Sequence, residues 1–403
     1  MYRCLSILAL LLLTNICVAE INAPAMIKIQ AGQHDREDSI VRVELPKSFI
    51  WKESYTLKTN DGALPLIPCQ KLEENNESFL LFRLQSPLKS GQSRGYLLVE
   101  QKHNKQEKVL AIQEKQLTLE FSGKPILRYN TAYLDSPDPK QPYFGRSGFI
   151  HPLYDPAGHE TTDDFPADHL HQHGIMFPWT KTSFRGHDID FWNSKLQQGK
   201  VEHRQLLKTI SGPVVGGFDA SLAHIDITSD EPVDVLNETW QVRVYPSQSY
   251  HLIEITSTQT CATKDPLNIK KYHYGGMAFR GNALWLNNSI SDFLTSEGKT
   301  RKDGNHTQPA WVDTHGLLEN IESGVTIIPH PSNFRYPQPV RLHPSKPYFC
   351  FTPQVESGFQ IKPGTPYVSK YRYVVRTGTF DAKLTDRLYK DYADPIKAKF
   401  IQE

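Results

Sequence analysis

The sequence predicts an all-β protein built as a small N-terminal β-sandwich followed by a larger antiparallel β domain. Two observations support this fold class. Aromatic residues make up 11% of the 403 residues, and 28 prolines and 24 glycines interrupt the chain. Short runs of alternating apolar and polar residues recur between these turn residues, as expected of half-buried strands. Helical spacing is confined to the C-terminal tail.

The first 19 residues, MYRCLSILALLLLTNICVA, predict a signal peptide. Arg3 precedes an apolar run from Leu5 to Leu13, and the small residue Ala19 provides a cleavage position. The rival interpretation, a permanent membrane anchor, needs about 20 apolar residues, and this run is shorter. We therefore expect an exported protein, periplasmic or extracellular.

The mature chain is expected to be electrically neutral. Removing Arg3 with the signal peptide takes 45 basic residues to 44, which equals the 44 acidic residues. A neutral chain lacks the excess of positive charge that is typical of nucleic-acid-binding proteins. No later segment is apolar for long enough to cross a bilayer, so we expect no membrane insertion after signal cleavage.

Residues 20–115 predict the first domain. SIVRVELP, YTLKT, FLLFRLQ and RGYLLVEQK have the composition of strands, with NDGALP and KSGQSRG as turns between them. The polar stretch EQKHNKQEKVLAIQEKQ marks the boundary with a second domain at 116–403. Three cysteines remain after the leader, Cys69, Cys261 and Cys350. Their spacing fits buried thiols, with one disulfide as the alternative.

Longer strands are predicted in the second domain. NETWQVRVYPSQSYHLIEITSTQT has the pattern of two long antiparallel strands joined by a turn at PSQSY. In the tail, Leu384, Leu388 and Tyr392 follow one another at four-residue spacing, and Pro395 comes three residues later. This spacing predicts a helix that ends before the proline.

The segment 168–174, DHLHQHG, concentrates the candidate chemistry. If it is extended, His169, His171 and His173 share one face of a strand. Such a face suits zinc coordination or proton transfer near neutral pH, with Asp168 orienting one ring. The alternative is a loop whose histidines are only hydrogen-bonded.

Four further segments add polar side chains at predicted strand ends. Trp192 can stack on a sugar ring or be buried in the core, and Arg280 can clamp a carboxylate. Their recurrence predicts one site assembled from several loops. The segments are GHDIDFWN with Asp190 and Trp192, YHYGGMAFR with Arg280, WVDTHG with Asp313, and IIPHPSNFRYPQP with His330, Asn333 and Arg335. No GxGxxG, GxxxxGK[ST] or HExxH motif occurs.

In their order and spacing these segments resemble the exported bacterial family labelled "methane oxygenase PmoA", over roughly residues 116–395. That family's D-H-P-H-H-R-G pattern is matched by Asp168, His169, His171 and Gly174. His173 stands where the family has arginine, so the resemblance implies that the pair His169 and His171 is the shared element. The other matching positions are Asp190, Trp192, Gly275, Gly276, Arg280, Trp311, Asp313, His330, Pro331, Asn333 and Arg335, while Thr314 and His315 depart from the pattern.

The resemblance implies a supersandwich similar to galactose mutarotase and a role in carbohydrate degradation. It does not imply methane oxidation, because a methane monooxygenase subunit is an integral membrane protein. We therefore expect a glycoside hydrolase or lyase acting on a carbohydrate substrate; no cofactor is assigned, and a divalent metal is the alternative considered below. His169 or His171 would transfer protons with Asp190 or Asp313 as the partner carboxylate, and Trp192, Arg280, His330, Asn333 and Arg335 would bind substrate.

Two alternatives remain open on the same residues. In one, His169 and His171 are ligands of a divalent metal in a metal-dependent enzyme. In the other, the polar loops recognise a glycan without catalysis.

Overall fold

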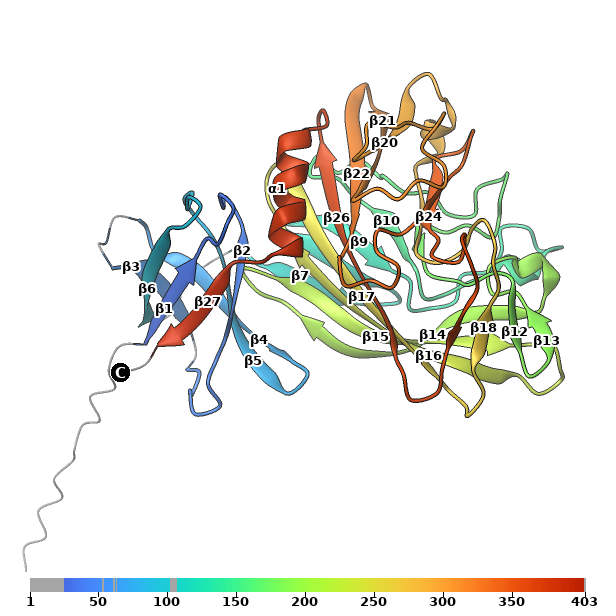
Figure 1. Ribbon diagram of the computed structural model, residues 1–403, viewed down its shortest axis with the longest axis horizontal. Coiled ribbons are helices and arrows are strands. Elements are labelled where there is room, and N and C mark those ends of the chain that lie inside the picture. Colours follow the sequence, from blue (N-terminus) through green and yellow to red (C-terminus); the bar gives the residue numbers. More distant parts are fainter. Residues whose placement is uncertain (1–24, 53, 61, 63, 102–106, 402–403) are drawn as a thin grey trace, which may run out of the picture.

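A computed structural model describes residues 25–52, 54–60, 62, 64–101 and 107–401. The predicted signal peptide at 1–19 lies outside these residues. The predicted all-β class is confirmed: strands dominate the described chain, which has one α-helix, α1 (Ala382–Ala393), and three short 3-10 helices, Pro142–Phe144, Ser194–Leu196 and Ala283–Leu286. Figure 1 shows a small N-terminal body in blue and a larger body beside it, with α1 between them.

The N-terminal domain is one strongly curled antiparallel sheet. In its described part the strand order is β2-β5-β4-β3-β6-β1-β27, and the edge strands β2 and β27 approach each other, so that the sheet nearly closes around its core. These strands are β1 (Met26–Gln30), β2 (Ile40–Glu44), β3 (Tyr55–Thr59), β4 (Ile67–Glu74), β5 (Glu77–Arg83), β6 (Ser93–Glu100) and β27 (Lys397–Ile401). Alternation buries one side of each strand, as at Ile27 and Ile29.

The pairing of two strands places both ends of the second domain at positions other than the predicted residues 116 and 403. β27 comes from the C-terminus and pairs antiparallel with β1, from Met26 opposite Ile401 to Gln30 opposite Lys397 (Figure 1). The stretch 397–401, which the sequence assigns to the second domain, therefore completes the first. Conversely, β7 (Val109–Gln113) precedes the predicted boundary but pairs with β8 (Leu117–Phe121) of the second domain. Alternation predicts a strand but does not identify its partner.

The second domain contains two large antiparallel sheets and one small sheet. In the described residues the first has the order β23-β24-β19-β11-β10-β9-β8-β7 and the second β14-β15-β16-β17-β26-β22-β21-β20, with β13-β12-β18-β25 beside them. The first sheet adds β9 (Lys124–Tyr129), β10 (Ile150–Leu153), β11 (Ile175–Met176), β19 (Ala278–Arg280), β23 (Val340–Leu342) and β24 (Tyr348–Phe351). The second comprises β14 (Gly199–Ile210), β15 (Gly216–Asp226), β16 (Val233–Tyr245), β17 (Tyr250–Cys261), β20 (Ser291–Thr295), β21 (Val312–Leu318), β22 (Ile321–Pro329) and β26 (Tyr367–Thr377). The small sheet comprises β12 (Thr182–Phe184), β13 (His187–Ile189), β18 (Leu267–Ile269) and β25 (Phe359–Ile361).

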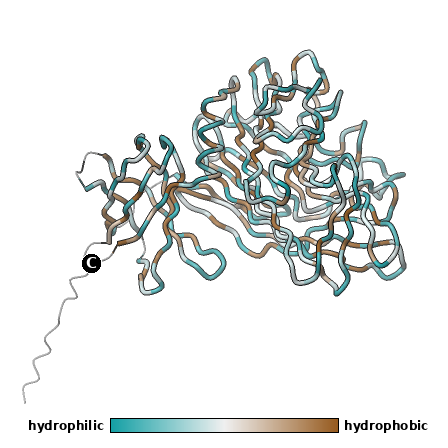
Figure 2. The backbone as a smooth tube through the Cα atoms, in the orientation of Figure 1, coloured by the Kyte–Doolittle hydropathy of each residue, from teal (hydrophilic) through white to brown (hydrophobic). Residues whose placement is uncertain are grey.

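The core of this domain lies between the two large sheets. Tyr129 of β9 packs against Phe218 of β15, with ring centroids 4.6 Å apart, and close to Trp240 of β16. Figure 2 shows the hydrophobic segments concentrated along these strands and the hydrophilic ones in the loops. The predicted long hairpin is confirmed, since β16 and β17 pair from Leu236 opposite Cys261 to Tyr245 opposite Leu252. Burial of these large aromatic side chains, together with the Val, Leu and Ile side chains around them, favours closing the sandwich.

The predicted C-terminal helix is confirmed as α1. The Asp381 carboxylate caps it by accepting hydrogen bonds from the backbone N–H groups of Lys383 and Leu384. Leu388 is buried against the second domain, whereas buried Asp391 receives a 2.9 Å hydrogen bond from Arg36 of the first. The helix therefore ties the two domains together.

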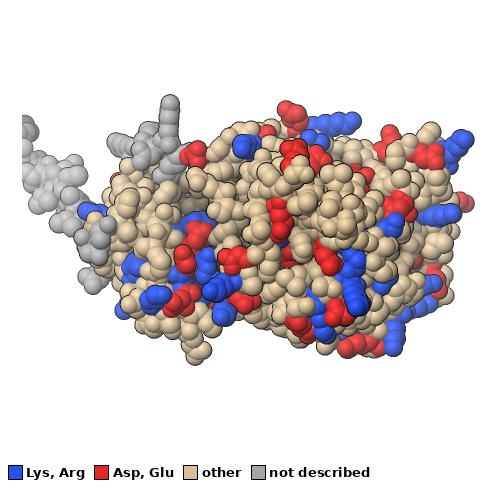
Figure 3. Space-filling model, turned by 90° about the horizontal axis from the view of Figure 1, so that it is seen from above, with Lys and Arg blue, Asp and Glu red and all other residues tan. Residues whose placement is uncertain are grey.

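Three general features complete the description. Cys69, Cys261 and Cys350 carry free thiols in the described chain. No helix in the described ranges is long and apolar enough to cross a membrane. Figure 3 shows Lys and Arg interspersed with Asp and Glu on the face seen from above, with no patch of a single sign there.

Candidate functional site

The segment DHLHQHG forms a turn, so the expectation that its three histidines share one strand face is wrong. The backbone N–H of His169 donates to the carbonyl of Pro166 and that of Gln172 to the carbonyl of His169, each at 2.8 Å. His173 is fully buried, and its Nδ1 lies 2.6 Å from Asp164 Oδ1. His169 and His171 lie together, with ring centroids 5.6 Å apart.

Gly174 explains why the chain turns here. A Cβ at this position would come within 2.2 Å of the backbone oxygen of Ile150, so a larger residue would push β10 and the turn apart. This close approach turns His173 into the core and leaves His169 and His171 at a cavity.

The cavity has a volume of about 240 Å³, just below the roughly 300–1,000 Å³ of most ligand pockets. None of its lining residues is an Asp or Glu. They come from five separate segments: His169, His171, Gln172, Trp192, Asn193, His273, Tyr274, Arg341, His343 and Tyr348.

His169 is oriented by a charged carboxylate. Its Nδ1 lies 2.9 Å from Asp168 Oδ2, and Asp168 also pairs with Arg280 Nη2 at 3.0 Å and Lys346 Nζ at 2.9 Å. Partial burial alone would raise the pKa of the Asp168 carboxyl, but hydrogen bonds from Lys346, His169 and Arg280 hold that pKa well below its usual range. In the neutral form of His169, the ionised Asp168 holds the ring proton on Nδ1 and leaves the lone pair on Nε2.

Arg280 forms an ion pair with Asp168. Its side chain is 1% exposed, and its Nη1 donates to Gln172 Oε1 at 3.0 Å. The sequence predicted that Arg280 binds substrate. The structure places it behind the cavity, where it positions Asp168 and Gln172.

Two further imidazoles in the cavity are neutral at ordinary pH. Burial, together with the neighbouring imidazoles of His169 and His173, lowers the pKa of His171 to about 4. Burial and the neighbouring Arg341 lower the pKa of His343 to about 4 as well. A neutral imidazole can donate or accept a hydrogen bond, depending on its tautomer.

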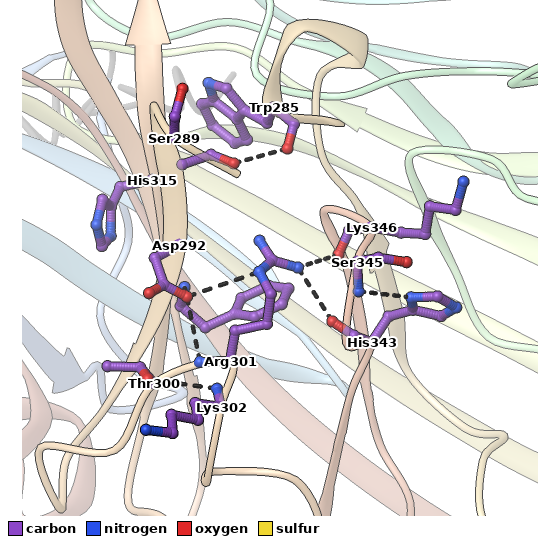
Figure 4. Close-up of polar contacts among 12 residues, drawn as sticks. Trp285, Ser289, Asp292, Thr300, Arg301, Lys302, His315, His343, Ser345 and Lys346 are labelled. Carbon is purple, nitrogen blue, oxygen red and sulfur yellow. Dashed lines mark hydrogen bonds and ion pairs between the residues drawn. The ribbon is translucent and has the colours of Figure 1, made fainter. Parts of the chain in front are cut away.

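The tautomer of His343 follows from its backbone partner. Its Nδ1 accepts the backbone N–H of Ser345 at 3.2 Å, so its proton belongs on Nε2. Arg301 fixes the loop 343–346, because its Nη1 donates to the carbonyls of His343 at 3.0 Å and Lys346 at 2.6 Å (Figure 4). His343 therefore presents a donor and His169 an acceptor.

Asp190 is a structural anchor for one cavity wall. It is buried and accepts hydrogen bonds from Thr180 Oγ1 at 2.7 Å and from the backbone N–H groups of Trp192 at 2.9 Å and Asn193 at 2.8 Å. These bonds fix Trp192, whose ring packs edge-on against Tyr274 at 5.4 Å. Asp190 does not line the cavity, so the structure gives it no access to a substrate there.

Asp313 lies elsewhere in the sheet. It is fully buried, pairs with Arg376 Nη1 at 2.5 Å, and accepts a 2.6 Å hydrogen bond from Thr326 Oγ1. His315 Nδ1 completes this cluster at 2.8 Å. Asp313 is not among the lining residues, and its contacts cross β21, β22 and β26, so it holds strands together.

The loop with His330, Asn333 and Arg335 is also separate from the cavity. The Asn333 amide donates to the Lys370 carbonyl at 2.8 Å, and Arg335 Nη1 donates to the carbonyls of Pro353 and Ser357, each at 2.6 Å. His330 lines a different groove, beside α1. The predicted convergence of this loop with His169 and His171 is not observed, because its polar groups are bound to backbone.

His273 and Tyr274 line the cavity and belong to the candidate segment YHYGGMAFR, in which the sequence assigned a role only to Arg280. Sequence reasoning missed Arg341, His343 and Tyr348, because the order β19-β24-β23 in the first sheet brings them to the turn at 168–172. For the metal alternative, the described ranges contain no group of three or more His, Cys, Asp or Glu side chains placed to hold an ion.

Comparison with known proteins identifies the family of the second domain. Residues 116–390 match the model of a family of unknown function, DUF6807, and the chain belongs to that family. No curated protein matches the sequence.

Proposed function

We propose that the protein is an exported carbohydrate-active enzyme in which His169 acts as the general base. One observation carries the proposal: His169 is bonded through Nδ1 to the ionised Asp168 and borders a cavity with aromatic walls. This pairing keeps a lone pair on Nε2, which is what proton abstraction requires. The resemblance to exported carbohydrate-degrading proteins supports a sugar as the substrate.

The other lining residues suit a sugar ring. Trp192, Tyr274 and Tyr348 offer aromatic surface for the C–H groups of a sugar, and Asn193 offers an amide. Because no carboxylate lines the cavity, the two-carboxylate mechanism usual in glycoside hydrolases has no support here. A mechanism in which histidines transfer the protons fits the lining residues better, because four of them are histidines: His169, His171, His273 and His343.

The test is a panel of neutral and acidic polysaccharides incubated with the full chain, with products measured as new reducing ends and by mass. We expect turnover of at least one polymer, and a loss of about 10²–10⁴-fold in kcat for His169→Gln. His187→Gln is the matched control, because His187 is also paired with a carboxylate, Asp226 at 2.7 Å, but outside the cavity. Binding of a glycan without any product contradicts the proposal and supports a non-catalytic glycan-binding protein.

A further inference from the structure

Arg341 is a cavity-lining cation without an acidic partner. It lies on β23, and no carboxylate of the described residues comes within ion-pair distance of it. Its Nη1 donates one long hydrogen bond, to the Leu342 carbonyl at 3.4 Å. Arg280, by contrast, is occupied by Asp168 and Gln172. Arg341 therefore keeps most of the donors of its guanidinium fork available.

The acidic groups near the cavity are already engaged. Asp168 pairs with Arg280, Lys346 and His169, as described above. Asp190 accepts several hydrogen bonds from its own turn, and Asp164 is bonded to His173. None of these carboxylates lines the cavity, so they leave the positive charge of Arg341 without a partner there.

A second guanidinium, that of Arg146, follows two residues after Phe144, whose ring centroid is 6.4 Å from that of His171. Arg146 is 4% exposed, and its Nε and Nη2 have no hydrogen-bond partner among the described residues. Burial lowers the pKa of Arg146 to about 10, so it stays charged at neutral pH. Its charge is one of the smaller causes that lower the pKa of His171 and of His173. A buried cation with unused donors favours an anion nearby.

We infer that the substrate is an acidic sugar, a uronate, whose carboxylate binds Arg341 in the cavity that His169 borders. The inference rests on the proposed function and specifies its substrate class. A guanidinium matches a carboxylate with two parallel hydrogen bonds. The neutral side chains beside it, His343 and Asn193, complete a site with donors and no competing negative charge.

A bound uronate carboxylate makes one reaction accessible, β-elimination. Arg341 stabilises the charge that develops on the carboxylate when His169 Nε2 takes the proton from C5. The C5–H electron pair forms the C4–C5 double bond while the C4–O bond breaks. The departing oxygen keeps that bond's electron pair and takes the Nε2 proton of His343. Solvent then removes the proton from His169 and reprotonates His343, so no oxidant or other co-reactant is needed.

The test compares binding of D-glucuronate and D-glucose to the full chain by titration calorimetry. We expect glucuronate to bind roughly tenfold or more tightly than glucose. Arg341→Gln should abolish this preference, whereas His169→Gln should retain it. Arg204→Gln is the matched control, because Arg204 is exposed and pairs with Asp234 away from the cavity.

The outcomes separate the two proposals. Equal binding of the two sugars, undetectable binding included, overturns the uronate inference, as does an unchanged preference in Arg341→Gln. His169-dependent turnover of a neutral polysaccharide alone also overturns it but leaves the proposed function standing. A glucuronate preference that depends on Arg341, with no product from any polysaccharide, supports uronate binding and contradicts the proposed function.

Discussion

Replacement of His171 is expected to change how the stability of the protein depends on pH. The ordinary pKa of histidine is about 6.5, and burial beside the imidazoles of His169 and His173 lowers the pKa of His171 to about 4 in the folded state. Between these two pH values the unfolded chain binds a proton that the folded chain does not. The free energy of unfolding therefore falls as the pH falls from 6.5 towards 4.

The size of the effect follows from that shift. Linkage gives a loss of about 2 kcal/mol from this one group between pH 7 and pH 5. His171→Gln and His171→Asn cannot titrate, so each should lose about 2 kcal/mol less stability than the wild type over the same interval. The two replacements should agree with each other.

Urea unfolding at pH 7 and pH 5, followed by circular dichroism, measures the difference directly. Contributions from titrating groups away from the cavity cancel when the variant is compared with the wild type. If both replacements lose as much stability as the wild type between the two pH values, His171 is not held neutral by burial, and the description of the cavity is wrong.

Three further changes test other parts of the structure. Asp190→Ala removes the acceptor for Thr180 and the Trp192 turn and should lower the free energy of unfolding by about 2–4 kcal/mol in urea; a loss under about 0.5 kcal/mol contradicts its anchoring role. Arg376→Met leaves Asp313 buried and unpaired and should cost roughly 3–5 kcal/mol, against little change for the exposed control Arg204→Met. Deleting residues 397–401 exposes the edge of β1 and should lower the thermal midpoint and increase light scattering; an unchanged midpoint would show that β27 contributes nothing to the first domain.

The strands and the helix were predictable because their signals are local. The alternation in 237–260 predicts β16 and β17, and the spacing of Leu384, Leu388 and Tyr392 predicts α1. The pairing of β27 with β1 was not predictable, because it joins the two ends of the described chain. Alternation within 397–401 would fit an edge position in either domain.

The candidate site was predictable in part. His169, His171 and Trp192 were identified because they stand in segments rich in polar and aromatic residues, and all three line the cavity. The roles of Asp190 and Arg280 were not predictable, because a buried anchor and a substrate ligand use the same residue types. Arg341 and His343 lie some 170 residues further along and reach the cavity through sheet order, which a local pattern does not contain.

The most direct test of the central claim is kcat for His169→Gln, Asp168→Asn and the double variant on the best polysaccharide substrate. Because Asp168 acts through His169, we predict about a 10–100-fold loss for Asp168→Asn and a loss of about 10²–10⁴-fold for His169→Gln. The double variant should be no worse than His169→Gln alone. Turnover of His169→Gln at the wild-type rate would contradict the assignment of His169 as the base.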